Sequence, residues 1–176
     1  MFSAGHSEGV TYIDTASDGY SLLTNSKDQT IKIWDVRNFS DENSAIQQQS
    51  RISDNRNRLD YRYDQPENWG FGRVIERKPR KFLQEHLLKS FSITMLLDDS
   101  SVMTLAGHRV TTTLIRARFS PQYTGSRYVY SGDSNYGYCV WDLFTGQLIV
   151  KNDFFHRMNV RDCSWHPHRP LIATSR

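Results

Sequence analysis

The chain has 176 residues, a net charge of +3 and a mean hydropathy of −0.63, so its length allows one ordinary domain with a hydrophobic core. So small a charge does not by itself indicate nucleic acid or a membrane surface as a partner. No apolar run reaches the length of about 18 residues that a membrane-spanning helix needs. The first six residues lack the basic and apolar regions of a secretory signal.

The two cysteines, Cys139 and Cys163, have no neighbour at the spacing of metal ligands. We therefore predict two reduced thiols in an intracellular protein of the nucleus, the cytoplasm or both, with no metal and no cofactor.

Two units of the sequence repeat in register. The first runs from Gly5-His6 to Trp34-Asp35 and the second from Gly107-His108 to Trp141-Asp142. Residues 22–37 align with residues 129–144 without a gap, and the extra residues of the second unit fall at 121–127, in a turn that tolerates insertion. A third unit begins at His156, where residues 160–167 resemble residues 115–121. Within the units, alternating and aromatic-rich runs predict β-strands.

A Gly-His pair, several short strands and a closing Trp-Asp pair resemble the WD40 repeat. The resemblance implies an all-β fold: a partial WD40 β-propeller of about two and a half blades, each a four-stranded antiparallel sheet. An unrelated β-sandwich is the alternative. We divide the chain into a blade at 1–37, an insert at 38–100, a blade at 101–150 and the start of a third blade at 151–176. Because propellers typically have four to eight blades, we expect a partial sequence or a truncated isoform that is marginally stable or aggregation-prone alone.

In WD40 blades a histidine, a strand hydroxyl, a turn aspartate and the tryptophan usually form a hydrogen-bonded chain, because buried polar groups need partners. By this resemblance the first unit supplies His6, Asp28 and Trp34, with Thr24 or Ser26 as the hydroxyl. A hydroxyl, a histidine and a carboxylate also occur together in hydrolases. Here no nucleophile elbow or oxyanion donor is evident and the set recurs in each unit, which favours a packing role over catalysis.

The second unit supplies a shorter set, His108, Ser131 and Trp141. Asn135 stands where the first unit has its turn aspartate, so we expect a weaker, neutral chain. The third unit has His156 without a preceding glycine.

The insert at 38–100 contains equal numbers of basic and acidic residues. Its first part, which includes three consecutive glutamines, has the composition of a disordered segment. Its aromatic residues between Tyr61 and Phe71 form a peptide-binding patch or pack on the propeller, and packing is favoured. The basic run at 73–81 is a solvated loop by default, with a role in nuclear import or nucleic-acid binding as the alternative. The apolar spacing at 82–97 predicts a short amphipathic helix.

The end of the first unit carries a more specific pattern. Residues 22–37 contain paired apolar residues, small residues, an aspartate and then Trp34-Asp35-Val36-Arg37. This order resembles the docking box by which WD40 substrate receptors of cullin-4 ubiquitin ligases bind their damaged-DNA-binding adaptor. Asn25 departs from the small-residue rule of the box. Segments at 60–62, 99–104, 113–121 and 160–167 resemble the same receptors.

The resemblance implies that Asp35 and Arg37 bind the adaptor. Both side chains alternate with Val36 and leave the strand end on the same side, where the planar guanidinium can bind carboxylates or carbonyls. The second unit ends in Trp141-Asp142-Leu143-Phe144 and has no arginine at this place.

The sequence therefore predicts a non-catalytic substrate receptor of a cullin-4 ligase. Its partners would be the adaptor and a protein target for ubiquitin-dependent degradation, and neither a membrane nor nucleic acid is expected. The alternative is a general WD40 interaction scaffold in another nuclear or cytoplasmic assembly.

Overall fold

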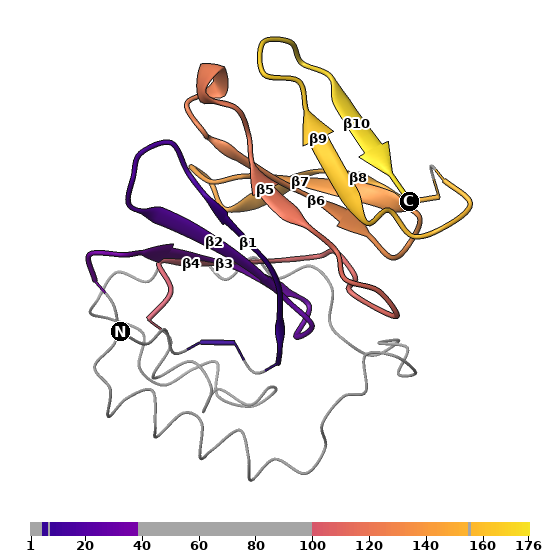
Figure 1. The fold of residues 1–176 in the computed structure, drawn as a ribbon, viewed down its shortest axis with the longest axis horizontal. Coiled ribbons are helices and arrows are strands. Elements are labelled where there is room, and N and C mark those ends of the chain that lie inside the picture. Colours follow the sequence, from indigo (N-terminus) through magenta and orange to yellow (C-terminus); the bar gives the residue numbers. More distant parts are fainter. Residues whose placement is uncertain (1–4, 7, 39–99, 155) are drawn as a thin grey trace, which may run out of the picture.

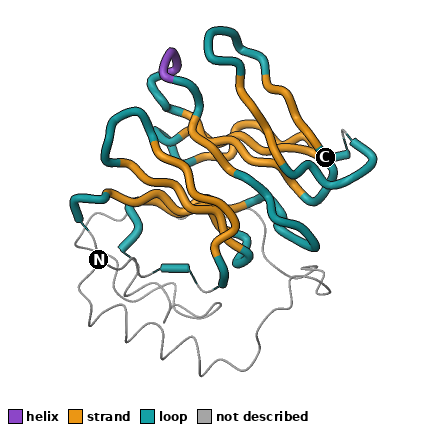
Figure 2. Tube along the Cα trace, viewed as in Figure 1, coloured by secondary structure: helices purple, strands orange, loops and turns teal. Residues whose placement is uncertain are grey.

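The computed structural model describes residues 5–6, 8–38, 100–154 and 156–176. The helix expected over residues 82–97, and the aromatic and basic segments of the insert, lie outside the described residues. The described part consists of three antiparallel sheets and one short 3₁₀ turn, η2 (Gln122–Thr124). The all-β fold predicted from the repeats is confirmed there (Figures 1 and 2).

The first sheet has the strand order β1-β2-β3-β4. Its strands are β1 (Val10–Thr15), β2 (Ser21–Ser26), β3 (Thr30–Asp35) and β4 (Met103–Ala106). The fourth strand lies beyond the insert in sequence, and Met103 pairs with Ile33. The first sheet thus takes residues from both sides of the insert, whereas our division assigned all of 101–150 to the second blade.

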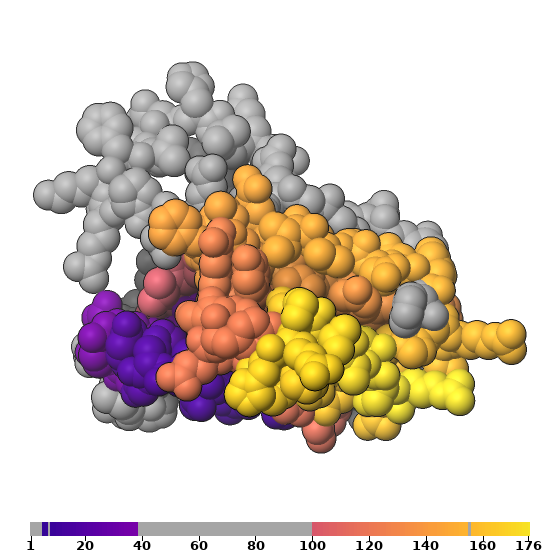
Figure 3. Space-filling view, turned by 90° about the horizontal axis from the view of Figure 1, so that it is seen from above, coloured from indigo at the N-terminus to yellow at the C-terminus, as the bar shows by residue number. Residues whose placement is uncertain are grey.

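The second sheet has the order β5-β6-β7-β8, and the third contains only two strands. The second comprises β5 (Ala117–Phe119), β6 (Tyr128–Asp133), β7 (Gly137–Asp142) and β8 (Gln147–Asn152). The third comprises β9 (Asp162–Trp165) and β10 (Ile172–Ser175). In the space-filling view of Figure 3, the indigo residues of the first sheet and the yellow residues of the third lie on either side of salmon residues from the second unit.

Alternating side chains place one core on each face of the second sheet. In β6, Val129 packs against the first sheet, where it meets residues such as Leu23 and Ile31. The next residue, Tyr130, points the other way and packs with Val160 and Cys163 of the third unit. Because side chains in a strand alternate between faces, a central sheet with apolar residues at successive positions is covered on both sides. This arrangement is that of neighbouring propeller blades.

The hairpin turns of the two complete sheets have the same backbone conformation. Gln29, between β2 and β3, has φ 68°, and Tyr136, between β6 and β7, has φ 67°. These residues are 107 positions apart, the offset that also relates Leu22 to Val129. The repeat therefore preserves turn geometry as well as strand pattern, even though neither turn residue is glycine.

Candidate functional site

The first sheet holds the hydrogen-bonded chain expected from the sequence. His6 Nδ1 lies 2.8 Å from Asp28 Oδ2, and His6 Nε2 lies 2.7 Å from Thr24 Oγ1. Trp34 Nε1 donates to the same hydroxyl oxygen at 2.7 Å. Ser26 lies at the side: its hydroxyl donates to the carbonyls of residues 8 and 9 and accepts from the Asp28 backbone N–H. Thr24 is thus the connecting hydroxyl, and the chain connects the segment before β1 to β2 and β3.

The second unit does not form the expected chain, which corrects the sequence interpretation. Ser131 donates to the carbonyls of Arg116 and Gly132, and Trp141 Nε1 donates to the Ala106 carbonyl at 3.0 Å. The His108 ring only contacts Trp141 edge-on. The third unit does repeat the histidine–threonine hydrogen bond of the first unit, since His156 Nε2 lies 2.6 Å from Thr174 Oγ1.

His108 instead connects the first two sheets. Its Nε2 lies 2.8 Å from Asn25 Oδ1, and Asn25 Nδ2 donates to the Ile115 carbonyl at 2.9 Å. Both side chains are fully buried. Burial lowers the pKa of His108 to about 4, because the charged ring would lose its hydration. Asn25, which departs from the small-residue pattern of the docking box, therefore has a structural role between the blades.

Asp133 is a buried carboxyl that sequence reasoning missed. It stands at the place of Ser26 in the repeat and accepts from the Asn135 backbone N–H at 2.6 Å, as Ser26 accepts from Asp28. Burial raises the pKa of this carboxyl. The alignment of the two units could have identified it, because a strand serine is replaced by an acid next to a turn.

Asp35 and Arg37 form a two-bond ion pair at the end of β3. Arg37 Nε donates to Asp35 Oδ1 at 2.9 Å and Nη2 donates to Oδ2 at 2.7 Å. The guanidinium carbon lies 3.9 Å from the centre of the Tyr20 ring, and the arginine side chain is 64% exposed. The Arg37 side-chain hydrogen bonds lower the pKa of Asp35 to about 2. The two residues predicted to bind a partner are thus held together, with the guanidinium flat on an aromatic ring at the surface.

A second pair of the same kind lies at the end of β7. Arg127, from the turn before β6, donates from Nε to Asp142 Oδ1 at 3.1 Å and from Nη2 to Oδ2 at 2.6 Å. Its guanidinium carbon lies 6.0 Å from the Phe144 ring centre. The pKa of Asp142 is lowered, chiefly by the Arg127 side-chain hydrogen bonds. Sequence reasoning found no arginine at position 144 and missed this one, which reaches the aspartate from the turn before β6.

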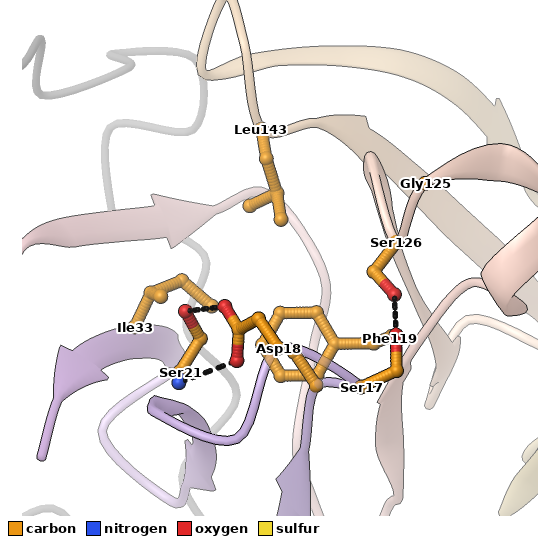
Figure 4. Close-up of a pocket in the computed structure, with 9 residues that line it drawn as sticks. Ser17, Asp18, Ser21, Ile33, Phe119, Gly125, Ser126 and Leu143 are labelled. Atoms are coloured by element: carbon orange, nitrogen blue, oxygen red, sulfur yellow. Dashed lines mark hydrogen bonds between the residues drawn. The ribbon is translucent and has the colours of Figure 1, made fainter.

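A small pocket lies between the first and second sheets and is lined by residues of both (Figure 4). Its volume is about 230 Å³. Ile33, Phe119 and Leu143 supply its apolar wall, and a hydrogen bond between the Ser17 and Ser126 hydroxyls crosses from one sheet to the other at 3.1 Å. Two of the lining residues are neighbours of the ion-paired aspartates. Ser21 is the register partner of Asp35, and Leu143 follows Asp142 in the sequence.

Both cysteine thiols are buried and unpaired with each other. Burial raises the pKa of Cys163 to about 12 and raises that of Cys139 further, so neither sulfur is a ready nucleophile. Within the described ranges, no three histidine, cysteine or acidic side chains gather as metal ligands would. Among the same residues no helix has the length and apolar character to span a membrane.

The sheets, the histidine–hydroxyl–tryptophan chain and the strand-end aspartates together define a WD40-type β-propeller segment. Residues 2–35 match the family model described as "WD domain, G-beta repeat". The chain therefore contains a WD40 repeat, and its sheets follow one another as the blades of a propeller do.

Curated relatives match almost the whole chain. The chain is 38% identical over 98% of its length to the DDB1- and CUL4-associated factor 11 homolog of Caenorhabditis briggsae, and 39% identical over 97% to the LEC14B protein of Lithospermum erythrorhizon. It spans only 27% and 31% of these relatives. A chain of the crystal structure of a mitotic checkpoint complex has a TM-score of 0.47 at 13% identity, covering 93% of this chain and 31% of that one.

Proposed function

We propose that this protein is a substrate-receptor subunit of a CUL4 ubiquitin ligase that docks on the adaptor DDB1 through Asp35 and Arg37. The observation that carries the proposal is the ion pair at the end of β3, which holds the Arg37 guanidinium at the surface in a fixed orientation. The similarity to DDB1- and CUL4-associated factor 11 homologs over nearly the whole chain supports it.

The geometry suits recognition of an acidic or carbonyl-rich surface. Asp35 occupies the Nε and Nη2 edge of the guanidinium, and Tyr20 covers one face of the plane. An arginine held this way loses little side-chain entropy on binding, because its rotamer is already restricted. Asp35 acts as the positioning residue and Arg37 contacts the partner. In this role the receptor also recruits a protein target for degradation, while catalysis belongs to other subunits.

We expect Arg37→Glu to abolish co-purification of DDB1 while the fold stays intact. Reversing the charge places an acid beside Asp35 and against a surface that binds a cation, and such reversal at an interface is costly. The measurement is quantitative recovery of DDB1 with the affinity-tagged full-length protein from cells, compared with the wild type.

The matched control for this experiment is Arg116→Glu. Arg116 is 51% exposed and also pairs with a carboxylate, that of Asp162, but it precedes β5 at the end opposite to the Ser120–Arg127 turn. Arg116→Glu should retain DDB1. Normal recovery of DDB1 with Arg37→Glu would favour the second candidate, a WD40 scaffold of another assembly.

A further inference from the structure

The first and second sheets end in equivalent ion pairs that are built from exchanged positions. Asp35 and Asp142 are related by the repeat offset of 107 residues. By the same offset, Tyr20 corresponds to Arg127, and Arg37 corresponds to Phe144. The arginine and the aromatic residue have therefore changed places, yet each aspartate still binds one guanidinium through two hydrogen bonds. The arrangement is kept although the residues that make it differ.

Both arginines use the same atoms for the aspartate. Nε and Nη2 donate to the carboxylate in each pair, and in neither arginine does Nη1 donate to any residue that the structure describes. The side chains are 64% and 50% exposed. Each sheet therefore presents a fixed amino group that can donate to an oxygen of another molecule.

The pocket between the first and second sheets adds an apolar element. With about 230 Å³ it is smaller than the roughly 300 Å³ at which pockets for drug-sized ligands begin. Ile33, Phe119 and Leu143 line it, and Ser17 and Asp18 lie at its polar edge (Figure 4). Such a cavity suits one aliphatic side chain of a protein partner better than a cofactor. We call the pocket together with the two ion pairs the rim surface.

We propose that the rim surface is one continuous docking surface across two blades, and that it binds a loop with an aliphatic side chain between two acceptor oxygens. The oxygens, carbonyl or carboxylate, would accept from Arg37 and Arg127, and the aliphatic side chain would fill the pocket. This inference rests on the proposed function, since the loop is assigned to DDB1. Arg127 is thereby a second contact residue.

The exchange of positions supplies the decisive experiment. The full-length protein is titrated with purified DDB1, and Kd is measured for the wild type, Arg127→Tyr and the double variant Arg127→Tyr with Phe144→Arg. Arg127→Tyr should weaken binding about tenfold or more, because the second guanidinium is lost. The double variant reproduces the arrangement of the first sheet, so it should return to within about threefold of the wild-type Kd.

Filling the pocket tests its apolar part separately. Ser17→Trp places a large ring at the pocket edge and should also weaken DDB1 binding about tenfold, because the aliphatic side chain can no longer enter. Arg116→Gln is the control for loss of an exposed, carboxylate-paired arginine, and should leave Kd unchanged. Thermal unfolding of each variant shows that the fold is kept.

The outcomes separate this inference from the proposed function. If Arg37→Glu abolishes binding while Arg127→Tyr and Ser17→Trp leave Kd unchanged, the rim surface is overturned and the function stands. If Arg127→Tyr weakens binding but the double variant does not restore it, Arg127 acts through the stability of Asp142 and the inference fails. Absence of DDB1 binding by the wild type overturns both.

Discussion

The stability of the protein is expected to fall by about 3 kcal/mol as the pH is lowered from 6.5 to 4, because of His108. The unfolded chain binds a proton at this histidine near pH 6.5, whereas burial keeps the folded ring neutral down to about pH 4. Between these values the unfolded state binds more protons, so the free energy of unfolding rises with pH. No described residue accepts from or donates to His108 Nδ1, so a proton added there would be buried without a partner.

The measurement is the urea midpoint of the protein at several pH values between 7.5 and 4. His108→Gln is the matched variant, because its amide can still donate to Asn25 Oδ1 but does not titrate. The raised pKa of Asp133 acts in the opposite direction, since its contribution is lost as the pH rises, and it remains in both proteins. The difference between the two curves therefore isolates His108. Identical pH dependence in the wild type and His108→Gln would contradict the prediction.

Gly132→Ala is expected to destabilise the protein by about 3 kcal/mol or more. A Cβ at this position would lie 2.1 Å from the Val160 carbonyl oxygen and 2.9 Å from its carbon. Val160 is fully buried, and its N–H donates to the Asp133 carbonyl at 3.2 Å, which holds the segment before β9 against the end of β6. The added methyl group must push this backbone away, and the packing between the second and third sheets is lost with it.

Gly9→Ala is the matched control for this substitution. A Cβ there would have only ordinary contacts, the nearest 3.8 Å away on the Lys27 side chain. We expect its free energy of unfolding to stay within about 0.5 kcal/mol of the wild type. The measurement is the urea midpoint of the wild type and the two variants. Equal midpoints for Gly132→Ala and Gly9→Ala would contradict the prediction and show that the third sheet can shift without loss of stability.

The strands and the turns of the two complete sheets could be predicted from the repeat, because strand alternation and turn conformation are local properties of the chain. The constant offset between residues 22–37 and 129–144 predicted that Asp35 and Asp142 occupy equivalent positions in the two units. The pairing of β3 with β4 could not be obtained this way. Paired residues such as Ile31 and Leu105 are separated by the insert. The local sequence does not indicate which sheet edge the strand after the insert will pair with.

Contacts between blades were predicted least well. The alignment placed His108 and Ser131 in one hydrogen-bonded chain, but His108 reaches Asn25 of the neighbouring sheet. The hydrogen-bond partner of a histidine between two sheets depends on how the sheets pack against each other. A repeat pattern in the sequence does not specify that packing. For the same reason Asn25 was interpreted as a departure from a motif rather than as a residue between blades.

The candidate site was predicted in part. That Asp35 and Arg37 leave the strand end on the same side followed from alternation, and the structure adds that they bind each other. Arg127 was missed because an arginine was expected only at position 144, which corresponds to Arg37 in the repeat. Tyr20 and Arg127 correspond in the repeat, so an exchange of residue types was the signal that could have identified the second pair.

The late arrival of β4 affects how the protein is made on the ribosome. Residues 36–102 must be synthesised after β3 before its hydrogen-bonding partner exists, which takes roughly 3 to 13 seconds at about 5–20 residues per second. Throughout that interval the edge of β3 from Thr30 to Ile33 offers unpaired backbone groups beside buried isoleucines. Until β4 is synthesised, this edge is a template on which another extended segment can pair.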